Sequence, residues 1–76
     1  MHYKERITTN PKVMLGKPVT KGTRITVELI LRKLSEGMSI NDLLKAYPHL
    51  KKEDIFAALS YSADVISKDA TLLKIS

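Results

Sequence analysis

The chain has 76 residues, a net charge of +5 and no cysteine. A chain of this length forms one small domain with a thin margin of stability, and without thiols it has neither disulfide bonds nor thiolate metal sites. No apolar run is long enough to span a membrane, and the first residues, MHYKER, lack the apolar core of a signal peptide, so we expect a cytoplasmic protein.

The positive charge is concentrated in the N-terminal third. Residues 1–25 carry six basic side chains and one acidic side chain, whereas residues 26–76 carry seven of each. The excess of +5 in residues 1–25 therefore points to an anionic partner for this part of the chain. The alternative is that the charge serves only solubility.

Residues 1–25 are predicted to form an extended β arm. Pro11 and Pro18 exclude a continuous helix, because proline lacks the backbone donor that a helix interior needs. The sequence TNPK at 9–12 favours a turn, since asparagine before proline commonly begins one. Residues 13–15 are suited to a short strand.

A β-hairpin is expected at the end of this arm. Residues 19–20 and 23–25 flank Lys21-Gly22, a two-residue loop whose glycine suits a tight turn with a positive φ angle. Gly22 is therefore assigned the turn, while Gly16 and Pro18 hold the entry of the chain.

Residues 26–67 are predicted to form three helices. Thr26 can cap the first and Gly37 can end it, while Ser39 can cap the second before Pro48 closes it. The third helix is expected from about Lys51 to about Ser67. Its predicted buried face consists of Ile55, Ala58, Leu59, Ser62 and Ile66. Residues 68–76 form a C-terminal tail, for which a strand, a docked tail and a disordered tail all remain open.

These elements predict a mainly α fold, with a three-helix homeodomain-like or helix-turn-helix core behind a short N-terminal β arm. A generic small helical bundle with a β arm fits the hydrophobic pattern equally well.

The sequence contains no convincing enzyme site. His2 and His49 stand alone, and Glu53 and Asp54 are adjacent, so on a helix they point in different directions. The stretch GKPVTKGT lacks the spacing of a phosphate loop. We therefore expect a protein that is not an enzyme and has no metal or cofactor.

Two ordered blocks carry a family resemblance. Residues 16–19, GKPV, precede residues 22–25, GTRI, and Tyr47-Pro48 precedes Glu53-Asp54-Ile55. This pattern resembles the family catalogued as domain of unknown function 433, a VapB-type antitoxin-like group, over roughly residues 5–66. The chain departs from the usual family pattern at Leu15, where a glycine is common, and at Lys51, where threonine or serine is common.

The resemblance implies a homeodomain-like fold, often as a homodimer. It also implies an antitoxin that is paired with a PIN-type ribonuclease toxin and that represses its own operon by binding operator DNA. The alternative is a stand-alone helix-turn-helix transcriptional regulator with no toxin partner. A third possibility is an adaptor that binds only proteins.

The candidate DNA-binding residues lie in two regions. Lys17 and Lys21 belong to the arm, and the third helix supplies Lys51, Lys52, Ser60 and Tyr61, the last two on its expected exposed side. Residues 51–67 have a net charge of −1, which is unfavourable beside phosphates, so the arm is the better electrostatic candidate. Arg24 is expected to have a structural role, tying the arm to Glu28 or Glu36.

The C-terminal tail is the candidate toxin-binding segment. Leu72, Leu73 and Ile75 are its apolar side chains, and they could anchor a toxin by strand addition or as a helix in a groove. The alternative, that the tail covers the domain's own core, is nearly as well supported by the pattern.

Overall fold

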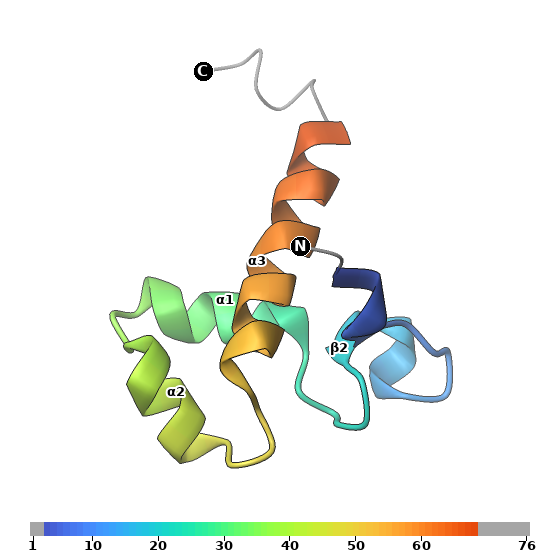
Figure 1. Cartoon of the computed structure of the whole chain (residues 1–76). Coiled ribbons are helices and arrows are strands. Elements are labelled where there is room, and N and C mark those ends of the chain that lie inside the picture. Colours follow the sequence, from blue (N-terminus) through green and yellow to red (C-terminus); the bar gives the residue numbers. More distant parts are fainter. Residues whose placement is uncertain (1–2, 69–76) are drawn as a thin grey trace.

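The structure, a computed structural model, describes residues 3–68 (Figure 1). Three α-helices form most of it, with a two-stranded sheet and two 3-10 turns at the N-terminal end. In chain order the elements are η1 (Tyr3–Glu5), β1 (Ile7–Thr8), η2 (Met14–Gly16), β2 (Val19–Thr20), α1 (Val27–Ser35), α2 (Ile40–Ala46) and α3 (Lys52–Lys68). The expectation of a mainly helical fold with a short N-terminal β element is confirmed. No helix within residues 3–68 is long and apolar enough to cross a bilayer.

The caps of α1 and α2 are those that the sequence predicts. The Thr26 hydroxyl accepts a hydrogen bond from the Leu29 N–H at 3.0 Å, and the Ser39 hydroxyl accepts one from Asp42 at 3.1 Å. Each bond satisfies an N–H that has no partner within its helix. The capping residues therefore fix where both helices begin.

Gly37 ends α1 as expected. Its φ angle is +95°, and the N–H groups of Gly37 and Met38 bond to the carbonyls of Leu34 and Lys33. This pair of bonds is a Schellman motif, which requires a left-handed residue at the first position and favours glycine there.

The predicted hairpin is only partly correct. The turn at Lys21-Gly22 exists, with Gly22 at φ +77°, and the Thr20 N–H bonds to the Ile25 carbonyl at 3.0 Å. Residues 23–25 form no strand, and across this turn β2 makes only an isolated antiparallel bridge, between Val19 and Thr26. The strand pairing of β2 is with β1, antiparallel, with Ile7 opposite Thr20 and Thr8 opposite Val19. Pairing with β1 places Ile7 in the helical core, and Ile25 packs against the same core.

The predicted strand at residues 13–15 is wrong. Met14, Leu15 and Gly16 have φ angles of +49°, +57° and +82°, so three consecutive residues are left-handed. The predicted turn before them is confirmed, because the Val13 N–H bonds to the Asn10 carbonyl at 2.8 Å. This turn and η2 together reverse the chain between β1 and β2, and they leave the Leu15 side chain 92% exposed.

The arm and the helices share one core. Its buried members come from β1, from all three helices and from the connection before α3: Ile7, Val27, Ile30, Leu43, Leu50, Ile55, Ala57 and Ala58. The arm is therefore part of the domain rather than an extension ahead of it.

The buried face predicted for α3 is only partly correct. Ile55 and Ala58 are fully buried, whereas Leu59 and Ile66 are 41% and 52% exposed. The exposure of Ile66 follows from its place near the C-terminal end of α3, which extends beyond α1 and α2 (Figure 1).

Candidate nucleic-acid interface

A group of cationic side chains surrounds the beginning of α3. Arg6, Lys21 and Lys51 line one recess with His49, Glu5 and Asp54, and Arg24 lines the neighbouring hollow, which also includes His49. We call the side chains of Arg6, Lys21, Arg24 and Lys51 the cationic cluster. Its members lie far apart in the sequence, so only the fold brings the arm and the third helix together.

Asp54 organises this cluster. One carboxylate oxygen accepts a hydrogen bond from Arg6 Nη1 at 3.1 Å, and the other accepts one from the backbone N–H of Lys51 at 2.9 Å. The side chain of Asp54 is almost buried, and these two bonds supply the partners that a buried carboxylate requires. Asp54 therefore performs part of the capping function that the side chain of Lys51 cannot perform.

The arm contributes Lys21 through its backbone. The Lys21 N–H donates to the Arg6 carbonyl at 2.7 Å, immediately after the β1–β2 pairing ends. Arg6 in turn holds Asp54, so a continuous set of bonds connects the turn of the arm to the first turn of α3. The backbones of Lys21 and Lys51 are consequently linked through Arg6 and Asp54.

This geometry changes the charge that α3 presents. Counted by sequence, residues 51–67 have two lysines against three acids, but the charge of Asp54 is compensated by Arg6. The remaining exposed charges at the helix entrance are those of Lys51, Lys52 and Glu53 on the side of α3, and those of Lys21 and Glu5 from the arm. The positive end of the helix dipole lies at the same place, so the entrance of α3 is more favourable to an anion than the summed charge predicts.

Lys52 lies beside this cluster on the outer face of α3. Its Nζ atom is 5.7 Å from the centre of the Phe56 ring, and Phe56 is 41% exposed. The ring restrains the ammonium group by a cation–π contact at the helix surface.

Lys17 has a different environment from the one expected. Its Nζ atom lies 3.1 Å from Glu28, which also pairs with Arg32 at 3.1 Å. Hydrogen bonds from Arg32 and Lys17 lower the pKa of Glu28 below its usual value, so the carboxylate is ionised at neutral pH. Lys17 therefore ties the arm to α1.

The tie expected between Arg24 and Glu28 or Glu36 is wrong, because within residues 3–68 no ion pair involves Arg24. Arg24 is exposed, and it lines both the hollow beside the α2–α3 connection and a hollow beside residues 8–13 of the arm. Arg6 and Lys17 supply the ion pairs that hold the arm.

Ser60 and Tyr61 do not join the cationic cluster. They lie about 13–15 Å along the helix axis from Lys51, at 1.5 Å per residue. The expectation that Tyr61 is on the exposed side is wrong, because it packs against the core and meets the Tyr3 ring edge-on, with 5.4 Å between centroids. Burial, followed by a hydrogen bond with Asp64, raises the pKa of Tyr3.

Sequence reasoning missed Arg6 and His49 as members of the site. Arg6 meets Asp54 across 48 positions, and no local pattern marks such a pair. For His49 a signal existed, because it lies in the short connection immediately before Lys51, at the entrance of α3. Leu72, Leu73 and Ile75, the predicted toxin-binding residues, lie outside the described residues.

Comparison with known proteins identifies relatives for most of the chain. "Uncharacterized protein y4eO" of Sinorhizobium fredii (strain NBRC 101917 / NGR234) is 34% identical over 59 residues, which are 78% of this chain and 27% of that protein. The crystal structure of a DUF433 member protein from Anabaena variabilis ATCC 29413 is similar, with a TM-score of 0.77 and 30% identity, over 83% of this chain and 62% of that one. The chain thus spans about a quarter of the curated relative and under two thirds of the solved structure. Residues 7–62 match the family described as "Protein of unknown function (DUF433)", and the chain belongs to this family.

Proposed function

We propose that the protein binds duplex DNA through the cationic cluster and acts as the antitoxin of a type II toxin–antitoxin pair. The observation that carries the DNA-binding proposal is the meeting of Lys21 and Lys51 in one recess at the entrance of α3. Phosphate neutralisation supplies much of the affinity of a protein for DNA, and two lysines that line one recess can both contact the phosphate backbone.

The arrangement of α2 and α3 supports a helix-turn-helix reading. A connection of five residues, 47–51, joins the two helices, and α3 is the longest helix of the described chain. In a helix-turn-helix protein the beginning of the second helix enters the major groove. Here that part of α3 presents Lys51, Lys52 and the exposed Phe56, and the arm adds Lys21 and Arg24 beside it.

The test is the salt dependence of binding to the DNA upstream of the gene, measured by gel shift or fluorescence anisotropy. We expect Lys21→Ala/Lys51→Ala to reduce the slope of log K against log salt by about 2, because each lost phosphate contact removes about 0.9. The matched control is Lys17→Ala/Lys33→Ala, which removes the same charge from lysines that are paired with Glu28 and Glu36. The control should keep most of the slope.

Two results would contradict the DNA-binding proposal. Equal losses in both double variants would mean that net charge alone drives binding. Binding that is absent, or insensitive to salt, would favour a protein that binds only other proteins.

The antitoxin part of the proposal rests on the family resemblance. Leu72, Leu73 and Ile75 are assigned to a PIN-type ribonuclease toxin, and a homodimer would present two cationic clusters to a symmetric operator. The test is co-expression with the product of the adjacent gene. We expect a stable complex and relief of growth arrest; DNA binding with neither result would leave the stand-alone transcriptional regulator.

A further inference from the structure

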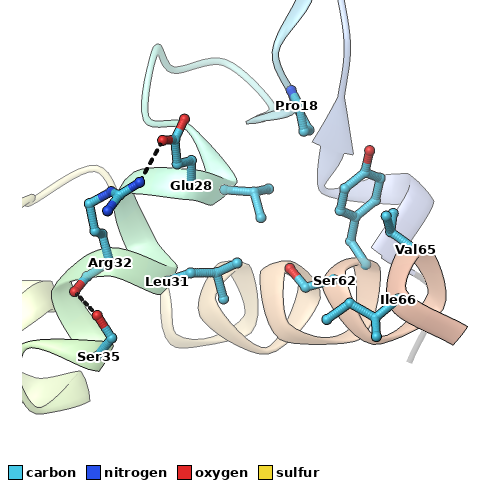
Figure 2. Close-up of a pocket in the computed structure, with 10 residues that line it drawn as sticks. Pro18, Glu28, Leu31, Arg32, Ser35, Ser62, Val65 and Ile66 are labelled. Carbon is cyan, nitrogen blue, oxygen red and sulfur yellow. Dashed lines mark hydrogen bonds and ion pairs between the residues drawn. The ribbon is translucent and has the colours of Figure 1, made fainter. Parts of the chain in front are cut away.

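An open apolar groove lies between α1 and the C-terminal half of α3 (Figure 2). Its volume is about 500 Å³. Leu31 of α1 faces Ser62 and Ile66 of α3 across it, and Pro18 stands at one end. The ion pair between Glu28 and Arg32 borders the groove, so its edge along α1 is polar.

The contact between α1 and α3 leaves part of the apolar surface in the groove exposed. Val65 and Ile66 are 49% and 52% exposed, although both line the groove. No segment within residues 3–68 covers them. Contiguous exposed apolar surface rimmed by polar side chains usually marks a contact site, and in so small a domain covering it would add substantially to the core.

The position of the groove identifies an occupant. Val65 and Ile66 belong to the last turn of α3, and the described chain ends at Lys68, two residues after Ile66. The chain continues with the eight residues DATLLKIS, of which Leu72, Leu73 and Ile75 are aliphatic. The end of α3, to which this segment is joined, lies at the edge of the groove, and such a tether gives an effective concentration in the millimolar range.

The segment is also long enough. Fully extended, eight residues span about 26 Å, whereas the nine residues of α1 span about 13 Å. Residues 69–71 can therefore reverse the chain and still leave residues 72–75 to run along α1.

We propose that Leu72, Leu73 and Ile75 occupy the α1–α3 groove of their own chain. The contact does not depend on the proposed function. The contact does, however, add a step to the proposed binding of a toxin, because a toxin that binds the same side chains has to displace them from the groove.

The absence of cysteine from the chain allows a direct test by disulfide trapping on the isolated protein. The test pair is Ser62→Cys with Leu73→Cys, in which position 62 lines the groove. The matched control is Ser60→Cys with Leu73→Cys, because Ser60 is on the same helix but is not part of the groove. In a glutathione redox buffer we expect the intramolecular disulfide to form about tenfold more favourably at position 62 than at position 60.

A third variant tests the apolar anchors. Adding Leu72→Ser and Ile75→Ser to the test pair should remove the preference for position 62, with the helix content checked by circular dichroism. If Ser62→Cys impairs folding, Val65→Cys replaces it, since that side chain is half exposed in the same groove.

Equal disulfide formation at positions 60 and 62 would overturn the proposal. So would a disulfide that forms only between two chains, because the occupant would then be the segment of a second copy. Neither result depends on DNA or toxin, so failure here is distinguishable from failure of the proposed function.

Discussion

At the scale of single residues, Asp54 connects the fold to the site. It is 8% exposed, and its carboxylate accepts hydrogen bonds from Arg6 of the arm and from the backbone N–H of Lys51, immediately before α3. The place of Asp54 at the beginning of a helix could be predicted from the sequence, since acidic side chains are common in the first turn. Its pairing with Arg6 could not be predicted, because the two residues meet only after the whole chain has folded.

The substitution Asp54→Asn should destabilise the protein. It removes the charge that compensates Arg6, whereas the amide oxygen can still accept from Lys51. Because Arg6 is partly exposed and solvent screens the pair, we expect the free energy of unfolding to fall by about 1–2 kcal/mol. Urea unfolding measures this change in free energy. The control is Glu53→Gln, an exposed neighbour, and equal effects of the two substitutions would contradict this role of Asp54.

At the scale of elements, the sequence predicts those whose signals are local. The beginnings of α1 and α2 follow from Thr26 and Ser39, and the end of α1 follows from Gly37, because a cap needs only its own side chain or a positive φ angle. The pairing of β1 with β2 could not be predicted in this way. Each strand has two residues, and their partnership depends on burying Ile7 under the helices.

The 3-10 turn η2 shows that a short apolar run is a weak predictor of a β-strand. Val13, Met14 and Leu15 are compatible with a strand, yet Met14 and Leu15 are left-handed and Leu15 is almost fully exposed. The resemblance contained the relevant information, since family members commonly have a glycine at position 15. A left-handed conformation is costly for leucine and not for glycine.

Replacing Leu15 should therefore stabilise the protein when the new residue tolerates the left-handed region. For Leu15→Asn we expect a gain of about 0.5–1 kcal/mol, because asparagine adopts this conformation readily and the exposed leucine contributes little burial. Leu15→Val should cause a loss, since a β-branched side chain is the least tolerant. Thermal unfolding of both variants measures the difference, and the same shift in both would contradict the left-handed turn.

At the scale of the whole molecule, the arm and the helices stabilise one another. Ile7 lies in the core with residues of all three helices, Lys17 pairs with Glu28, and Arg6 pairs with Asp54. The cationic cluster depends on two of these contacts, the burial of Ile7 and the bond between Arg6 and Asp54, which place the arm beside α3. Composition predicted an anionic partner for residues 1–25, but it could not show that Lys21 would lie beside Lys51 while Lys17 would not.

The substitution Ile7→Ala tests this mutual dependence. Truncating a buried isoleucine typically costs about 2–4 kcal/mol, and a domain of this size has about 4–11 kcal/mol in total. We expect the midpoint of thermal unfolding to fall by about 10 °C or more. At a temperature where the variant remains folded, DNA affinity should also fall, because Lys21 is held beside Arg6, the residue preceding Ile7. The control is Thr9→Ala, an exposed position just after β1, which should change neither quantity. An unchanged midpoint in Ile7→Ala would mean that the helices fold without the arm, and the cationic cluster would then lack the support that fixes its geometry.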